Sequence, residues 1–370
     1  MPLSLLRFGS EKEDSCGAMR RADKLLQDSD LNSAKCIRVG LINNMPDAAL
    51  EATERQYISL LNAASGDVSI QLSLYRLAAV PLGDHSIRHV NQFYSIFDPS
   101  TSSPLDGLIV TGREPRMPSL AEEPYWGDFV RLLAWAQENT LSTIWSCLAA
   151  HAAVFCMDGI DRIRNLEKHS GIFDCVRVSD HRVFQNTPFQ FKLPHSRWNG
   201  LPEDALSNCG YTVLTRTDHG CVDTFIRQLG SLFVFHQGHP EYETNTLLLE
   251  YRRDVGRYLR VETKTYPAMP RDYFDSVTTA ALKALENQAL CRPRQALLTE
   301  ASNVLENATI ENSWRSTAVC IYRNWITHLY EERERRMPLL LAVDRAAQLD
   351  PTIRLLSTGP NAVDSAPVPQ

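Results

Sequence analysis

The sequence predicts an α/β protein in which a doubly wound, mostly parallel sheet is flanked by helices. Two observations support this prediction. Short apolar, β-branched stretches alternate with amphipathic stretches of helical periodicity over the first two thirds of the chain, and this alternation is typical of parallel sheets with helices on both faces. The residue types that carry chemistry also follow directly after the apolar stretches, and parallel sheets place their sites at the carboxyl ends of strands.

The elements are expected in a definite order along the chain. Residues 1–35 are polar and mixed in charge, and we expect an N-terminal extension there. The expected strands are 36–43, 69–77, 106–112, 143–147 and the apolar run that opens Ser231–Tyr242. The expected helices are Ala49–Ala63, Glu123–Asn139 and 244–261. Short strand-like pieces at 175–180 and 211–217, and the segment between them, are expected to form the wall of a site.

The pattern predicts one main domain over residues 36–270. Tyr273–Arg335 is helical by pattern, and we expect a C-terminal helical region over 271–335 that packs on the core. Residues 336–370 are expected to form a flexible tail, because the chain becomes rich in Ser, Pro and Ala from residue 351. Aromatic residues in the C-terminal helices suggest a possible homodimer contact.

Composition and charge narrow the class of protein. The chain has 370 residues, is 44% hydrophobic and 22% charged, and carries a formal net charge of −6. This composition is that of a globular protein and offers no general attraction to nucleic acid or anionic lipid. Nine cysteines without paired spacing predict neither a disulfide framework nor a zinc site. With no membrane-length apolar run and no signal-like start, we expect a cytoplasmic protein without membrane or nucleic-acid partners.

Cys147 lies where an apolar strand is expected to turn directly into a helix. A side chain at such a bend stands clear of the sheet, and the unpaired N–H groups of the first helical turn can stabilise a thiolate and an oxyanion. Gly112 ends a neighbouring strand and would let the backbone approach a substrate. The backbone N–H groups of Arg113 and Leu148 are therefore candidate oxyanion-hole donors. Taken alone, however, Cys147 would be interpreted as an inert residue of the buried core, and Gly112 as a glycine required by a turn.

His239 and Glu241 end a second apolar run and lie two residues apart. In an extended strand, residues at this spacing point to the same face. A carboxylate beside an imidazole orients the ring and stabilises its charged form, so His239 is a candidate base with Glu241 as its partner. Together with Cys147 they form one candidate triad from two strand ends.

Several motifs resemble the homoserine O-acyltransferase family, which includes homoserine O-succinyltransferases and whose core is similar to class I glutamine amidotransferases. In chain order the motifs are INNMP, ATERQ, HVNQFY, DGLIVTG, PYW, the cysteine elbow, EKHSGIFD, PHSRW, GHPEYETNTLLLEYRRDV, SWRS and RNWITHLY. They span Cys36 to Tyr330, and their shared order is a far more specific signal than any one of them.

The resemblance implies a ping-pong acyl transfer in methionine biosynthesis. Cys147 would take an acyl group, most often succinyl, from acyl-CoA as a thioester, and would pass it to the hydroxyl of homoserine. The resemblance also implies that Lys168, Ser196 and Arg253 contact the amino-acid substrate, and that the reaction needs no metal and no cofactor besides acyl-CoA as co-substrate. Without the resemblance, Lys168 would be interpreted as a charge in a loop, Ser196 as a hydroxyl in a turn and Arg253 as an exposed charge on a helix. His195, next to Ser196, is expected to have a structural role.

Three positions depart from the family pattern. Asp47 and Ala48 stand where the family usually carries paired lysines, and Leu148 stands where it commonly carries Trp. Arg116 occupies the position that separates succinyl from acetyl users, where its charge could pair with a succinyl carboxylate; the alternative is an exposed arginine in a polar loop. An acetyl donor, another hydroxy amino acid as acceptor, a glutamine-hydrolysing amidotransferase and a non-catalytic binding protein therefore remain alternatives.

Overall fold

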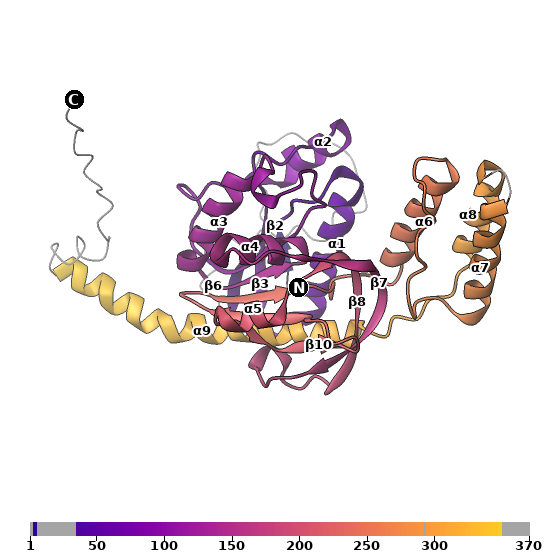
Figure 1. Cartoon of the computed structure of the whole chain (residues 1–370). Helices are drawn as coiled ribbons and strands as arrows, with labels where there is room; N and C mark the ends of the chain where they lie inside the picture. The colour runs from indigo at the N-terminus through magenta and orange to yellow at the C-terminus, as the bar shows by residue number, and fades with distance from the viewer. Residues whose placement is uncertain (1–2, 6–34, 292–293, 350–370) are drawn as a thin grey trace, which may run out of the picture.

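A nine-stranded sheet forms the centre of the computed structural model, which describes residues 3–5, 35–291 and 294–349 (Figure 1). The strand order is β1-β3-β2-β5-β6-β12-β11-β9, and the short β4 adds to β3. The strands are β1 (Leu3–Leu5), β2 (Cys36–Ile42), β3 (Ser69–Arg76), β4 (Ser95–Ile96), β5 (Leu105–Val110), β6 (Thr140–Ser146), β9 (Thr212–Val213), β11 (Thr224–Gln228) and β12 (Leu232–His236). All neighbours pair in parallel except β11, which runs antiparallel to β12 and β9. The predicted α/β fold with a mostly parallel sheet is therefore confirmed.

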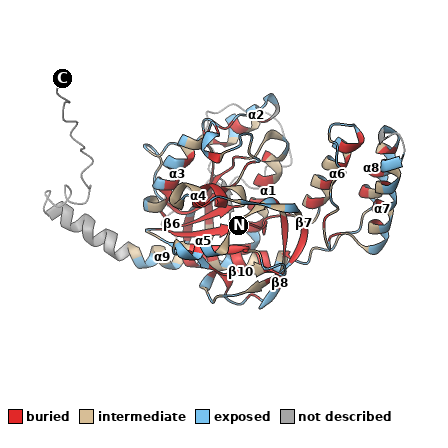
Figure 2. Ribbon diagram, in the orientation of Figure 1, coloured by how far each residue is buried: buried red, intermediate tan, exposed pale blue. Residues whose placement is uncertain are grey.

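Helices cover both faces of this sheet. The helices are α1 (Asp47–Ala64), α2 (Asp84–Phe93), α3 (Trp126–Asn139), α4 (Leu148–Asp158), α5 (Glu203–Asn208), α6 (Thr246–Leu259), α7 (Ser276–Cys291), α8 (Leu298–Glu306) and α9 (Arg315–Leu349). One core contains α1, α9 and one face of the strands, and the other contains α3, α4, α5 and the opposite face. The strands between these layers are mostly buried (Figure 2).

The long helix α9 packs directly on the sheet. Trp325 is fully buried, and its indole N–H donates to the hydroxyl of Ser142 on β6 at 2.9 Å. Gly107 on β5 permits this contact, because a Cβ there would lie 2.5 Å from Leu329 and 2.8 Å from Trp325. By contrast, α7 and α8 pack against α6 in a separate apolar cluster at one end of the molecule (Figure 1). The region expected over 271–335 therefore has two parts with different packing.

A second, antiparallel sheet lies beside the first, with the order β10-β7-β8. Its strands are β7 (Ile163–Arg177), β8 (Gln190–Gly200) and β10 (Thr215–Thr217). The sequence suggested only a short strand-like piece at 175–180 and an irregular wall after it, and that prediction was too short. The proline of β8, Pro194, hid the strand, but β8 is an edge strand, where a residue without an N–H is tolerated.

The two ends of the chain differ from expectation where they are described. Leu3–Leu5 forms β1 at the edge of the main sheet, pairing with β3, although an unpaired extension was expected. The open edge of β3 supplies the backbone groups for that pairing. A flexible tail was expected from residue 336, but α9 continues to Leu349, so this prediction was wrong for residues 336–349. The remaining parts of both predictions, 6–34 and 350–370, lie outside the described residues. None of the helices in the described ranges combines the length and the hydrophobicity needed to cross a lipid bilayer.

Candidate active site

Cys147 lies in a sharp bend between β6 and α4. Its φ is 50° and its ψ is −112°, a conformation that a residue with a side chain rarely adopts. The surrounding structure holds the bend, because the N–H of Cys147 donates to the carbonyl of His236 at the end of β12, at 2.7 Å. Strain of this kind is found where function requires a particular side-chain direction. The thiol is partly exposed at the carboxyl edge of the sheet.

Leu148 opens α4, where backbone N–H groups have no acceptor within the helix. Gly112, two residues after β5, lies against this turn. A Cβ at Gly112 would lie 2.7 Å from both the N and the Cβ of Leu148 and 3.0 Å from the N of Ala149. Glycine is therefore required to leave the first N–H groups of α4 accessible. Arg113 is the next residue, so the structure brings both predicted oxyanion-hole residues to one place.

His239 and Glu241 lie at the same edge of the sheet, in the loop after β12. The ring Nδ1 of His239 is 2.8 Å from the Oε1 of Glu241, and both side chains are buried. The pairing of β12 with β6 places His236 beside Ser146, so the two chain segments that carry His239 and Cys147 leave the sheet next to each other. The predicted triad residues are thus brought together.

The electrostatics of the three groups are coupled. Burial by itself would lower the pKa of His239, but the Cys147 sulfur and the Glu241 carboxylate raise it well above the usual value. The protonated imidazole is therefore stabilised between a sulfur and a carboxylate. This arrangement lets His239 both receive and release a proton during a reaction at Cys147.

His195 supports the loop that carries His239. Its Nε2 is 3.2 Å from the Oδ1 of Asp223, and both side chains are fully buried. The intervening Gly238 packs on this pair, since a Cβ there would lie 2.8 Å from Asp223 and 2.9 Å from His195. The N–H of His239 also donates to the carbonyl of Pro194 at 2.8 Å. Cys175 lies close enough to complete a three-ligand cluster with His195 and Asp223, but burial raises the pKa of its thiol well above the usual value; a thiol is a poor metal ligand.

The three residues expected to contact an amino acid lie together on one side of His239. Lys168 is in β7 beside a bulge, Ser196 is in β8, and Arg253 is exposed on α6. Two carboxylates on α6 join them. Ser196 and Lys168 both contact Glu250, with the lysine at 3.7 Å, while Lys168 and Arg253 contact Asp254 at 3.7 Å and 2.8 Å.

Glu250, Asp254 and Tyr242 belong to this site but were missed from the sequence. The hydroxyl of Tyr242 donates to Glu250 at 2.6 Å, and its ring stacks on His239. Glu250 and Asp254 are one helical turn apart and therefore lie on one side of α6. That spacing was readable in the sequence, but carboxylates one turn apart on a helix are usually solvated, so the signal is weak.

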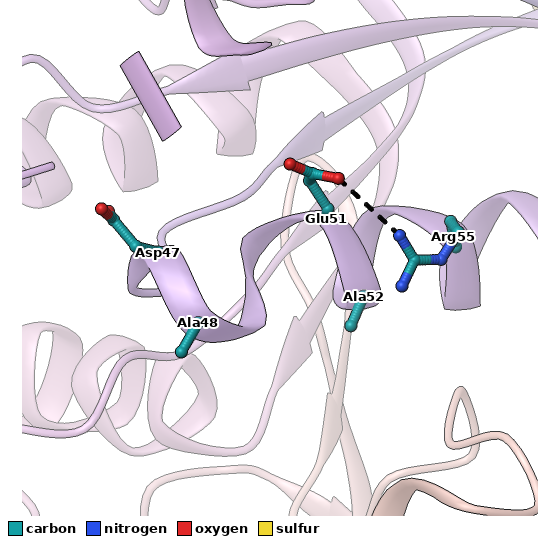
Figure 3. A pocket seen from close by; sticks show the side chains of 5 residues that line it. All are labelled: Asp47, Ala48, Glu51, Ala52 and Arg55. Atoms are coloured by element: carbon teal, nitrogen blue, oxygen red, sulfur yellow. Dashed lines mark ion pairs between the residues drawn. The ribbon is translucent and has the colours of Figure 1, made fainter. Parts of the chain in front are cut away.

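Two of the three departures from the family pattern, Arg116 and the Asp47–Ala48 pair, lie away from the triad, whereas Leu148 directly follows Cys147. Arg116 is exposed in the loop after β5, where its N–H and that of Met117 donate to the buried Glu123. Asp47 and Ala48 open α1 and line a surface hollow of about 440 Å³ together with Glu51, Ala52 and Arg55 (Figure 3). The N–H of Gly83 donates to the Asp47 carboxylate at 2.9 Å. The residues that line the hollow include none of the triad, and two of them, Asp47 and Glu51, are acidic.

Three of the motifs meet away from the triad. Glu54 of ATERQ is buried and accepts hydrogen bonds from His89 and Tyr94 of HVNQFY, at 2.7 Å and 2.8 Å. Asn43 of INNMP in turn donates to the Tyr94 hydroxyl at 3.0 Å. These hydrogen bonds hold the loops after β2 and β3 in place relative to each other. A structural role therefore explains why the three motifs occur together.

Comparison with known proteins identifies the family. The model of the homoserine O-succinyltransferase family matches residues 23–335. The chain belongs to this family. A homoserine O-succinyltransferase from Rhodopseudomonas palustris is 42% identical over 300 residues, which cover 81% of this chain and 90% of that protein. One from Methylorubrum extorquens is 41% identical over 290 residues, with 78% and 86% covered.

Similar solved structures are more distant. A glutamine amidotransferase from Thermotoga maritima has a TM-score of 0.41 and 13% identity, covering 80% of this chain and 98% of that chain. A glutamine amidotransferase from Methylobacillus flagellatus has a TM-score of 0.44 and 12% identity, with 80% and 95% covered.

Proposed function

We propose that this protein transfers a succinyl group from succinyl-CoA to the hydroxyl of homoserine, through a thioester on Cys147, as a step of methionine biosynthesis. The observation that carries the proposal is the strained bend at Cys147, which holds the thiol beside the His239–Glu241 pair. The relatives named above are homoserine O-succinyltransferases, which supports this choice of substrates.

In the first half-reaction the Cys147 thiolate attacks the thioester carbonyl of succinyl-CoA. The negative charge that develops on the carbonyl oxygen is stabilised by the N–H groups of Leu148 and Arg113. The bond to the CoA sulfur then breaks, and the departing thiolate takes a proton from the charged His239. The product is a succinyl thioester on Cys147 and free CoA.

In the second half-reaction His239 acts as a base. It takes the proton of the homoserine hydroxyl, whose oxygen attacks the Cys147 thioester, and the Cys147 thiolate leaves as O-succinylhomoserine forms. Glu241 keeps the imidazole in one orientation and stabilises its charged form throughout.

The cluster on α6 suits the acceptor. Arg253 and Lys168 can bind the carboxylate of an amino acid, and a guanidinium does so with two parallel hydrogen bonds. Glu250 and Asp254 can bind its ammonium group, while the ring of Tyr242 separates this cluster from His239. An acceptor held there would present its side-chain hydroxyl to the base.

Intact-mass measurement tests the proposal. The wild-type protein incubated with succinyl-CoA alone should gain one succinyl group on the peptide that contains Cys147, and homoserine should then remove it. Cys147→Ala should gain nothing, and Cys156→Ala is the matched control because Cys156 lies on the same helix away from the bend. Glutaminase activity without turnover of any acyl-CoA would overturn the proposal in favour of an amidotransferase.

Three further expectations belong to the same proposal. The reaction needs acyl-CoA as co-substrate and no other cofactor or metal. The protein works in the cytoplasm without nucleic-acid or membrane partners, and it can form a homodimer. Size-exclusion chromatography with light scattering measures whether the protein is a dimer in solution.

A further inference from the structure

Arg197 on β8 is a buried guanidinium with one nitrogen left unpaired in the part of the chain that the structure describes. Its side chain is 4% exposed. Its Nε donates to the Nδ1 of His195 at 3.2 Å and its Nη1 to the carbonyl of Asn199 at 2.6 Å. The remaining nitrogen, Nη2, has no hydrogen-bond partner among the described residues, and no described carboxylate forms an ion pair with this side chain. A buried charge is strongly unfavourable unless an opposite charge pairs with it.

Two further donors at the start of β7 are also unpaired. The Nδ2 of Asn165, in β7, and the Nη1 of Arg162, just before β7, are buried and have no partner in the described structure. A Cβ built on Gly200 would lie 3.0 Å from the Nη1 of Arg197 and 3.6 Å from the Oδ1 of Asn165, so Arg197 and Asn165 lie close together. Arg197 and Asn165 thus offer unpaired donors at one place.

His151 is within electrostatic range of both guanidinium groups and cannot neutralise them. Burial first, and then the charges of Arg197 and Arg162, lower its pKa to about 3 against the opposite effect of the hydrogen bond with Gln237. The Nε2 of His151 is 2.8 Å from the Oε1 of Gln237, whose amide nitrogen is fixed by donation to the carbonyl of Val222. His151 therefore donates from Nε2 and stays uncharged.

Two carboxylates lie near these groups, and neither forms an ion pair with the arginines among the contacts of the described residues. Asp223 accepts from Thr215 and Thr224 on one oxygen and faces His195 with the other. Glu123 accepts two backbone N–H groups on Oε1, while its buried Oε2 has no hydrogen-bond partner in the described structure. Asp223 and Glu123 thus act on Arg197 and Arg162 only through longer-range electrostatics.

This donor-rich region is next to the nucleophile. The Arg197 guanidinium interacts electrostatically with the sulfurs of Cys221 and Cys147. His151 is one helical turn along α4 from Cys147. A group attached to Cys147 and carrying a negative charge a few bonds away could place that charge beside the unpaired donors of Arg197 and Asn165.

We propose that Arg197, together with Asn165, binds the terminal carboxylate of the succinyl group. This inference rests on the proposed function. The carboxylate is separated from the thioester carbonyl by two methylene groups, so it stays near Cys147 both in succinyl-CoA and in the acyl-enzyme. The site differs from the expectation for Arg116, which is exposed and lies on another loop.

The site would set the choice of donor. An acyl group without a terminal carboxylate leaves the buried guanidinium unpaired. A site that forms hydrogen bonds with a polar group of its substrate discriminates strongly against an analogue without that group, far more strongly than an apolar pocket discriminates between substrates that differ by one methylene. We expect the wild-type protein to acylate Cys147 about 100-fold or more faster with succinyl-CoA than with butyryl-CoA, which has the same chain length and no charge.

The test measures this ratio by intact mass in the absence of acceptor, so that an amino-acid carboxylate plays no part. Arg197→Met should lower the succinyl-to-butyryl ratio at least about 10-fold while butyryl transfer persists, because Met fills similar space without charge. Arg197→Lys should retain an intermediate ratio, and Asn165→Ala should lower the ratio less than Arg197→Met. Arg164→Met is the matched control, since Arg164 is exposed and stacks on Trp198, and it should keep the wild-type ratio.

The outcomes separate the two proposals. If Arg116→Gly lowers the ratio and Arg197→Met, Arg197→Lys and Asn165→Ala do not, the carboxylate site is overturned in favour of the exposed loop. A wild-type protein that acylates equally well from both donors also overturns it, while the thioester mechanism stands. Absence of any acylation of Cys147 overturns the proposed function itself. Should Arg197→Met not fold, the Arg197→Lys and Asn165→Ala ratios decide.

Discussion

The imidazole of His239 stacks on the phenol ring of Tyr242, with ring centroids 4.2 Å apart and an angle of 18° between the planes. The Tyr242 hydroxyl reaches in the opposite direction to Glu250, which also contacts Ser196 and Lys168. One aromatic ring thus connects the catalytic base to the cluster proposed for the acceptor.

Tyr242→Phe keeps the stacking but removes the hydrogen bond to Glu250. A hydrogen bond to a charged group contributes about 1.5 kcal/mol, so the KM for homoserine should rise about 10-fold. The rate of Cys147 acylation by succinyl-CoA alone should not change, and stopped-flow or quenched-flow mass measurement follows it. An equal loss in both half-reactions would show that the hydroxyl positions His239 instead.

Gly112→Ala should block the oxyanion hole. The new methyl group would lie 2.7 Å from the N of Leu148, which forces the loop away from the first turn of α4. Loss of an oxyanion-hole donor lowers kcat by about 100- to 1,000-fold, and we expect that range for both half-reactions. A variant with wild-type kcat would exclude these N–H groups from catalysis, provided that its melting temperature is also that of the wild type.

Glu241→Gln should lower the pKa of His239. The carboxylate is one of the two groups that raise this pKa against the opposite effect of burial, and glutamine keeps the shape without the charge. Nuclear magnetic resonance of nitrogen-labelled histidine measures the shift, and kcat should fall by about 100-fold or more. An unchanged His239 titration would mean that the Cys147 sulfur alone determines the raised pKa.

Asp223→Asn should destabilise the fold in a pH-dependent way. Burial would raise the pKa of Asp223, but His195 and Thr215 hold it well below the usual range. A lowered carboxylate pKa adds stability above the unfolded value of about 3.9, and that stability is lost as the pH falls below it. The variant should lose about 3 kcal/mol at neutral pH, and the difference from wild type should shrink in acid. Urea unfolding at several pH values measures it, and a pH-independent difference would contradict the prediction.

Gly107→Ala should weaken the contact between α9 and the sheet. The added methyl group would clash with Leu329 and Trp325, and overpacking of this kind costs about 1–3 kcal/mol. Gly127→Ala is the control, because Gly127 lies near the start of α3 with only the Arg131 guanidinium within 4 Å of an added methyl group, at 3.8 Å. That change should be neutral or stabilising, and thermal unfolding distinguishes the two.

The sequence was most informative where structure is local. The alternation of apolar and amphipathic stretches predicted the parallel sheet, and the position of Cys147 between strand and helix predicted the bend. The long antiparallel pairing of β7 with β8 was missed, because it joins residues far apart in the chain and contains Pro194 in an edge strand. Lys168 consequently reads as a loop residue in the sequence, although it lies in β7.

The residues proposed to bind the acceptor were predicted only in part, again because their contacts join distant parts of the chain. The resemblance named Lys168, Ser196 and Arg253, but the contacts of Ser196 and Lys168 with Glu250 depend on how α6 meets β7 and β8. Nothing in the sequence indicated that Arg197 is buried, since arginine side chains are mostly exposed. Its burial follows from the pairing of β8 and the side-chain alternation along it, which point Arg197 to the same side as His195.

The packing of α9 on β5 and β6 has a consequence for synthesis of the protein. Every strand that this helix covers leaves the ribosome before the helix does. Until the helix is made, the apolar residues of the sheet that it covers lack part of their packing, because α1 and the second sheet cover only the rest of that core. Translation that stops ahead of Arg315 would therefore yield a polypeptide that has all of the triad residues and an incompletely covered core.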